Sequence, residues 1–167
     1  MIILKSLKTT NLSKNLILSI CKLKNTHWKN KIVSQKNFFK KNCKSQDLHN
    51  LLYHNKKLIG YTLLRKRIFF LGSVSKKYLL FDTIIVDKMF RKHKYAHFLM
   101  NFNNLTIKKN KIRSYLLCNK ELINFYKNFS WKVENSSKFI IDKKKPLKTV
   151  MSFNLKNKNI NMINLHI

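Results

Sequence analysis

Apolar residues in the first 48 positions follow a strand-like and then a helical pattern. The segment MIILKSL at 1–7 is apolar and short enough for a β-strand. Asn11 can cap a following helix, in which apolar residues from Leu16 to Leu23 recur at helical spacing. Ser34 is the next candidate cap, ahead of a short helix over SQKNFFKKN. This part of the chain predicts one strand and two helices.

The following segment predicts three strands. Two β-rich runs, 49–53 and 58–67, are joined by HNKK, in which Asn55 can take a turn conformation, so they predict a hairpin. A third run, YLLFDTIIV at 78–86, follows a loop that contains Gly72. This run is apolar enough to lie centrally in a sheet.

The rest of the chain alternates between helix and strand. Residues 91–109 place apolar side chains from Tyr95 to Leu105 on roughly one face of a helix, and 112–118 is the next strand. A second helix is predicted over 120–129, where apolar residues recur at i, i+3, i+4 and i+7. Strand-like runs close the sequence at 131–134, 138–141 and 149–155.

Length and composition bound the class of protein. A chain of 167 residues suits one domain, placed at 1–155 and followed by a polar tail at 156–167. Hydrophobic residues make up 44% of the chain, which argues against intrinsic disorder. Two glycines are too few for the glycine-rich phosphate loops of the P-loop and dinucleotide-binding classes.

Cysteine usage and the apolar runs bear on the compartment. The three cysteines are an odd number without CxxC spacing, which indicates a reduced, cytoplasmic protein. The longest apolar run near the N-terminus, 16–21, is too short to span a membrane. Lysines surround this run, so an organellar transit peptide is the alternative to a core helix.

The charge balance adds a second functional hypothesis. The chain carries 36 Lys and Arg against 6 Asp and Glu, a formal net charge of +30. Lysine is spread through all predicted elements, whereas proteins that read nucleic acid usually concentrate their cations on one stripe. Lys, Asn, Ile and Phe also have codons rich in A and T, so genome composition is one explanation. A small basic nucleic-acid-binding protein without catalysis, which binds non-specifically at low salt, is the alternative function.

Candidate chemistry concentrates in TIIVDKMFRKHKYAHFLM at 83–100. It predicts a buried strand, a four-residue loop and a helix whose first turn carries Arg91, Lys92 and Lys94. The N-terminus of a helix leaves backbone N–H groups unpaired and carries a partial positive charge, so it attracts anions. Cations in that first turn are unfavourable for the helix itself, but they suit a bound phosphate.

This segment resembles motif A of the GNAT superfamily of acetyl-CoA-dependent N-acetyltransferases. Val86 ends the strand, Phe90-Arg91 opens the motif, Ala96 falls on its Gly/Ala position and Leu99-Met100 supplies its apolar pair. Lys94 departs from the pattern, because the family has a glycine there that lets the backbone approach the pyrophosphate. With ordinary helical angles, Lys94 still presents its N–H group, and its ammonium adds a phosphate contact.

A second stretch, 114–133, resembles motif B of the same family. Asn119 falls on the family's pantetheine-contacting Asn, Tyr126 on a Tyr that is often the general acid, and Trp131 on the aromatic residue after the turn. Ser130 replaces the usual glycine. LIGYTLLRK at 58–66 likewise resembles the family's third strand. A GNAT-like fold that has lost catalysis is a further alternative, because Lys94 and Ser130 stand at glycine positions.

The resemblance implies a fold and a function. The fold is a mixed α/β domain with a largely antiparallel sheet of six or seven strands flanked by about four helices. The function is transfer of an acetyl group from acetyl-CoA to a primary amine, with no metal. Backbone N–H groups near Ile85 and Val86 face the thioester carbonyl. The implied cofactor-binding residues are Ile84, Ile85, Val86, Arg91, Lys92, His93, Lys94, Tyr95, Ala96 and Asn119.

Two side chains are candidates for proton transfer. Tyr126 is the candidate acid, because a phenol with an ordinary pKa of ~10 is protonated at neutral pH; its structural alternative is a core residue with its hydroxyl at the rim. Asp82 lies among apolar residues of the predicted strand 78–86, where burial would make a carboxylate a better base. Its alternatives are a structural carboxylate or a water relay that replaces it.

Other reactive side chains have more ordinary explanations. Cys118 lies beside the predicted pantetheine channel but reads as a buried free thiol. His93 and His97 are four residues apart on a helix, without the carboxylate of a metal motif. His27 and Trp28 either line an acceptor pocket or pack between helices. The positive charge favours an anionic acceptor, such as a nucleotide-linked amino sugar or a protein N-terminus.

Overall fold

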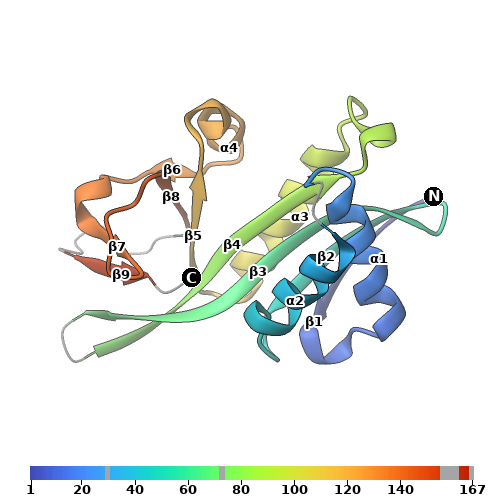
Figure 1. Cartoon of the computed structure of the whole chain (residues 1–167). Coiled ribbons are helices and arrows are strands. Elements are labelled where there is room, and N and C mark those ends of the chain that lie inside the picture. The colour runs from blue at the N-terminus through green and yellow to red at the C-terminus, as the bar shows by residue number, and fades with distance from the viewer. Residues whose placement is uncertain (29–30, 72–73, 155–161, 166–167) are drawn as a thin grey trace. The chain divides into compact units, whose positions relative to one another are not determined.

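The computed structural model describes residues 1–28, 31–71, 74–154 and 162–165 (Figure 1). Its helices are α1 (Lys14–Asn25), α2 (Ile32–Asn42), α3 (Tyr95–Lys109) and α4 (Ile123–Lys127). Its strands are β1 (Ile2–Lys8), β2 (Leu48–His54), β3 (Lys57–Leu71), β4 (Val74–Val86), β5 (Arg113–Cys118), β6 (Lys132–Val133), β7 (Phe139–Ile141), β8 (Thr149–Phe153) and β9 (Ile163–Leu165). Short 3₁₀ turns lie at Thr9–Asn11, Lys88–Phe90, Lys120–Leu122 and Ser136–Lys138.

Seven strands are hydrogen-bonded in the order β1-β2-β3-β4-β5-β8-β6, and β7 and β9 form a second sheet. The pairs β1–β2, β2–β3, β5–β8 and β6–β8 are antiparallel, and β4–β5 is parallel. The predicted mixed α/β fold, with a largely antiparallel sheet of six or seven strands and about four helices, is confirmed. Two compact units are present, Met1–Arg65 with Thr83–Asn103 and Lys66–Asp82 with Asn104–Ile167.

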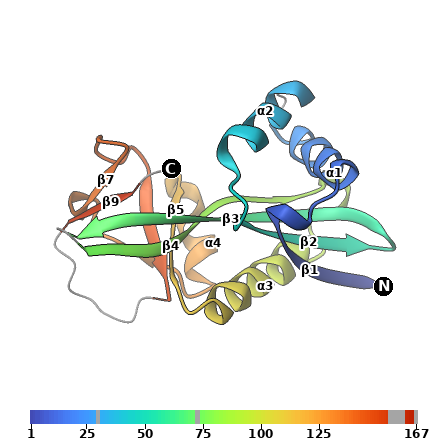
Figure 2. The same cartoon turned by 90° about the horizontal axis from the view of Figure 1, so that it is seen from below.

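The first unit has a core on each face of its strands. Figure 2 shows α1 and α2 on one face and α3 on the other. Side chains of β2 alternate, so Leu51 joins the cluster of α1 and α2, whereas Leu52 joins Leu99 of α3. A Cβ at Gly60 would lie 3.1 Å from Leu52 and 3.2 Å from Leu99, so the missing side chain lets α3 approach β3.

Buried polar side chains reinforce this unit. The ring of His49 is fully buried, with Nε2 2.8 Å from the Thr9 hydroxyl and Nδ1 2.8 Å from the Tyr61 hydroxyl. Burial lowers the pKa of His49 to about 4. A second group joins β2 and β3 to α3, because Asn103 on α3 accepts hydrogen bonds from Asn50 and Thr62 at 3.0 and 2.8 Å.

The second unit is centred on an aromatic cluster. Phe69, Tyr78 and Tyr115 are fully buried. Tyr115 packs edge to face against the other two rings and against Phe139 of β7. The turn after α4 is fixed by Trp131, which stacks on Phe153 and donates a hydrogen bond from Nε1 to Asn104 Oδ1 at 3.0 Å. These contacts hold α4 against the strands.

Element boundaries differ from the predictions in several places. The cap of α1 is Ser13, whose hydroxyl accepts a hydrogen bond from the Leu16 N–H, so the prediction of Asn11 is wrong. Ser34 lies inside α2, whose N-cap position is Lys31. The predicted helix over 91–109 begins at Tyr95, and the helix over 120–129 is a 3₁₀ turn followed by the short α4. Residues 163–165 of the predicted tail form β9, and 155–161 and 166–167 lie outside the described residues.

Left-handed backbone angles occur at nine non-glycine residues of the described chain, and five of the nine are lysines. Asn55 and Lys56 form the two-residue turn between β2 and β3, as the hairpin prediction requires. Ser130 has φ 64° in the turn that follows α4. The left-handed conformation is strained for a residue that has a Cβ. Helices that end with a left-handed residue therefore usually have glycine there.

Ser130→Gly is expected to raise the free energy of unfolding by about 1 kcal/mol, because glycine relieves the strain of the left-handed backbone. The greater entropy of glycine in the unfolded chain offsets part of the stabilisation, and the stated value is what remains. Urea unfolding measures the change. The control is Ser136→Gly, since Ser136 is exposed and has no positive φ. Equal effects of the two changes would contradict the strain argument.

Candidate functional site

The segment between β4 and α3 is anchored at its first residue, Asp87, which contacts β3. The Asp87 N–H donates to the Ile59 carbonyl at 2.7 Å, directly after β4 ends. Its carboxylate accepts from the Met89 N–H at 3.1 Å and lies 3.3 Å from the Lys57 ammonium. These contacts fix the start of the loop that leads into α3.

This loop presents a row of backbone donors. Lys92 and Lys94 have φ 71° and 58°. Left-handed residues in such a loop are typical of nests, in which successive backbone N–H groups form an anion-binding concavity. Within the described chain, the N–H groups of residues 92–96 have no hydrogen-bond acceptor. A cavity of about 250 Å³ lies here, lined by Val86, Phe90, Arg91, Lys92, Lys94, Tyr95, Ala96 and His97. We call residues 91–96 the anion cradle.

Two predictions about the anion cradle are wrong in detail. Arg91, Lys92 and Lys94 precede α3 and do not lie in its first turn. Lys94 does not have ordinary helical angles, because its φ of 58° lies in the left-handed region. Glycine adopts this region without a steric penalty, so a lysine at this position carries local strain.

The Arg91 side chain turns back toward the end of β4. Its Nε donates to the Val86 carbonyl at 3.3 Å, and its Nη2 lies 3.4 Å from His27 Nδ1. His27 packs edge to face on Trp28, with ring centroids 4.8 Å apart. The guanidinium thus links the anion cradle to the end of α1, and the acceptor role of His27 and Trp28 stays a prediction.

The hydrophobic residues before the cradle pack into the core of the first unit. The side chains of Ile85 and Val86 are buried in the two core clusters of the first unit, and Ile84 packs against one of them. Their proposed contribution to the site is through main-chain groups. His93 and His97 have no third metal-ligating partner, since no group of three His, Cys, Asp or Glu residues suits a metal ion in the described ranges.

Tyr126 lies on α4 in an aromatic environment. It is 7% exposed and packs edge to face against Phe81, Phe125 and Trp131. Burial raises the pKa of Tyr126 to about 12. The hydroxyl therefore stays protonated throughout the neutral range, as a hydrogen-bond donor must be.

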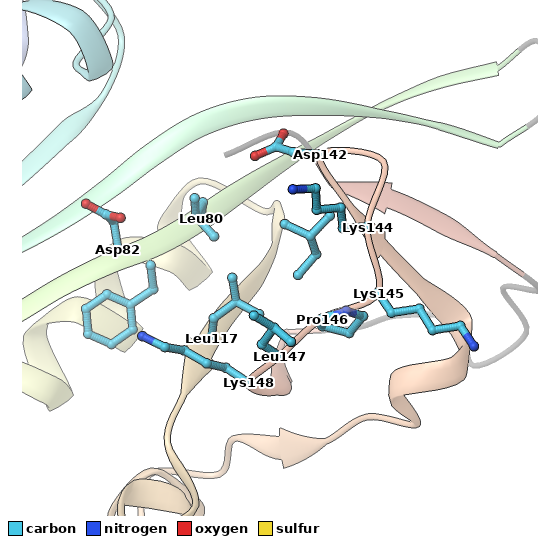
Figure 3. A pocket seen from close by; sticks show the side chains of 11 residues that line it. Leu80, Asp82, Leu117, Asp142, Lys144, Lys145, Pro146, Leu147 and Lys148 are labelled. Atoms are coloured by element: carbon cyan, nitrogen blue, oxygen red, sulfur yellow. The ribbon is translucent and has the colours of Figure 1, made fainter.

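Asp82 is exposed, so the expectation that it is buried among apolar residues is wrong. Asp82 lies where β4 separates from β5. The register of β4 and β5 joins Tyr78–Phe81 to Arg113–Leu116 and ends there. Asp82 is the next residue of β4 and lines a cavity of about 530 Å³ in the second unit (Figure 3). Its role as a base stays a prediction.

Asn119 and Cys118 lie at the end of β5. Asn119 is exposed, and its Nδ2 donates to Glu121 Oε1 at 3.1 Å. Cys118 is buried, with its Sγ 3.7 Å from the Met151 sulfur, and burial raises the pKa of its thiol. Cys118 is therefore a packed free thiol, in line with its ordinary explanation.

Comparisons with known proteins identify the fold. No protein-family model matches the chain, and no curated protein matches its sequence significantly. ElaA from Escherichia coli matches with a TM-score of 0.66 and 18% identity, over 91% of this chain and 99% of that chain. The ribosomal-protein-S18-alanine N-acetyltransferase from Escherichia coli matches with a TM-score of 0.65 and 14% identity, over 97% and 99%. Naa50 from Arabidopsis thaliana, in complex with the bisubstrate analogue CoA-Ac-MVNAL, matches with a TM-score of 0.62 and 17% identity, over 92% and 99%.

The chain has the GNAT fold. The recognition made on motifs A and B is confirmed at this level, since both motifs lie on the elements expected for them, β4 to α3 and β5 to α4. No helix among the described residues is long and apolar enough to cross a membrane.

Sequence reasoning missed the loop after β7. In this GNAT fold, Asp142, Lys144, Lys145 and Lys148 line the larger cavity together with Asp82. The run DKKKPLK at 142–148 was the available signal, but a lysine run in so basic a chain is indistinguishable from a solvated surface loop. The cavity arises from the fold and not from the run itself.

Proposed function

We propose that the protein is an N-acetyltransferase that moves an acetyl group from acetyl-CoA to a primary amine, within a single domain at 1–155. The observation that carries the proposal is the anion cradle. Its unpaired N–H groups at 92–96, together with Arg91, Lys92 and Lys94, suit the pyrophosphate of a coenzyme A molecule. The GNAT fold supports the same donor.

Each step of the chemistry has a candidate group. The amine nitrogen bonds to the acetyl carbon, the carbon–sulfur bond breaks, the amine loses a proton and the thiolate gains one. Backbone N–H groups at Ile85 and Val86 are the proposed donors to the developing oxyanion. Tyr126 is the proposed acid that donates its proton to the leaving thiolate, and Asp82 or a water molecule takes the amine proton. Asn119 is proposed to contact the pantetheine arm.

Acetyl-CoA is expected to stabilise the protein by about 2.7 kcal/mol at a hundredfold excess over its dissociation constant. Thermal unfolding with and without acetyl-CoA measures this. The control is inorganic pyrophosphate at equal charge concentration, because a chain with a net charge of +30 gains some stability from any polyanion. No extra stabilisation by the cofactor would contradict the proposal.

A further inference from the structure

The cavity beside Asp82 has an apolar floor. Its volume of about 530 Å³ lies within the range of roughly 300–1,000 Å³ that small-ligand pockets span. Leu80, Phe81, Leu117 and Ile141 line it from the strands, and Pro146 and Leu147 line it from the loop after β7. The whole cavity belongs to the second unit. Such a floor suits an apolar side chain.

Charged side chains surround this floor. Asp82 lies on β4 and Asp142 at the turn after β7, while Lys144, Lys145 and Lys148 come from the loop (Figure 3). Lys148 extends toward the Asp82 end, whereas Lys145 points away from it. A carboxylate at that end suits an ammonium or amine, and the lysines suit acidic groups on the same ligand.

Backbone hydrogen bonds close the turn that carries Asp142 and Lys144. Ile141 and Lys144 exchange backbone hydrogen bonds of 2.8 and 2.9 Å across the left-handed residues Asp142 and Lys143. The Asp142 N–H also donates to the Leu165 carbonyl of β9 at 3.1 Å. The chain's own hydrogen bonds therefore shape this wall of the cavity, and a wall shaped in advance lowers the ordering cost of binding a ligand.

We infer that the acceptor is the terminal amine of a peptide whose first side chain is apolar and whose next residues are acidic. This inference rests on the proposed acetyl transfer. The apolar first side chain lies on the floor, the amine lies toward Asp82, and the acidic side chains pair with Lys144 and Lys148.

Two other acceptor classes fit the cavity less well. An amino sugar needs polar groups for its hydroxyls, but the floor is lined by Leu, Phe, Ile and Pro side chains. A polyamine carries the same charge as the three lysines, which outnumber the two carboxylates.

The test compares short C-terminally amidated peptides, with release of free thiol from acetyl-CoA as the readout. Leucine followed by two glutamates is expected to exceed leucine followed by two lysines by about tenfold or more in kcat/KM at low salt. This gap should shrink toward 1 M salt, where the screening length is ~3 Å. Replacing the leucine by serine should lower kcat/KM by about tenfold, and an N-acetylated peptide should be inert.

Charge reversal at the cavity supplies the matched variants. Lys144→Glu with Lys148→Glu is expected to reverse the preference between acidic and basic peptides and to leave the KM for acetyl-CoA unchanged. The control is Lys5→Glu with Lys8→Glu, which changes the net charge by the same amount. These two lysines are exposed on β1 and do not line the cavity, so this variant should keep the preference for acidic peptides.

The outcomes separate the inference from the proposed function. Equal rates with acidic and basic peptides, or faster acetylation of a UDP-linked amino sugar or of spermidine, would overturn the inference and leave acetyl transfer standing. An equal change of peptide preference in the two double variants would also overturn the inference and leave acetyl transfer standing. Absence of both acetyl-CoA stabilisation and thiol release with every amine would overturn the proposed function together with the inference.

Discussion

Tyr126→Phe is expected to lower the turnover of acetyl transfer by ~10²- to 10⁴-fold, the usual contribution of a positioned proton donor. The change removes one hydroxyl and keeps the ring, so its aromatic contacts with Phe81 and Trp131 remain. Little stability should be lost, and the KM for acetyl-CoA should not change. Steady-state kinetics and thermal unfolding of the same samples measure the three quantities.

Tyr115→Phe is the matched control for this experiment. Tyr115 is also a buried tyrosine of the second unit, and burial raises the pKa of its hydroxyl as well. It packs in the aromatic cluster and has no proposed role in transfer, so its variant should keep the native turnover. Native turnover in Tyr126→Phe would show that Tyr126 is a core residue without a role in proton transfer. Water would then be the proton donor.

Acid is expected to remove about 3 kcal/mol of stability through His49 alone. The pKa of His49 is about 4 in the folded protein against 6.5 for the unfolded chain. Between these values the unfolded chain binds a proton that the folded protein does not, so the free energy of unfolding falls as the pH falls from about 6.5 to about 4. Above about pH 6.5 the contribution is constant.

Urea unfolding at a series of pH values tests this expectation. The variant His49→Gln should lose most of the pH dependence attributed to His49, whatever its absolute stability. His54→Gln, at the end of β2, is the control and should keep the native slope. If the free energy of unfolding of His49→Gln depends on pH as steeply as that of the native protein, the carboxylates and not His49 cause the acid sensitivity.

The sequence predicts elements well where hydrophobic spacing decides the structure. The hairpin of β2 and β3 follows from alternating apolar residues and from the turn preference of Asn55, and the register confirms it. Helix starts are less predictable, because Asn11 and Ser13 are both good cap residues and the sequence alone does not distinguish them.

The sequence predicted the order of the candidate site residues along the chain, but it did not predict that Asp82 is exposed. The apolar neighbours of Asp82 suggested burial, yet β4 leaves its pairing with β5 at Phe81, and no local pattern signals that point. The conformation of Lys94 is also hidden, because lysine gives no sign of a left-handed angle. The roles of Tyr126 and Asn119 stay predictions that kinetics must test.

The left-handed lysines have a consequence for mutational tolerance. Folded domains are stable by only about 5–15 kcal/mol, and a strained left-handed residue costs about 1–2 kcal/mol. Lys56, Lys92, Lys94, Lys111 and Lys143 all take this conformation, so the chain has less margin to absorb further destabilising changes. A background with glycine at Lys56 and Ser130 would accept cavity-forming core substitutions that unfold the native sequence.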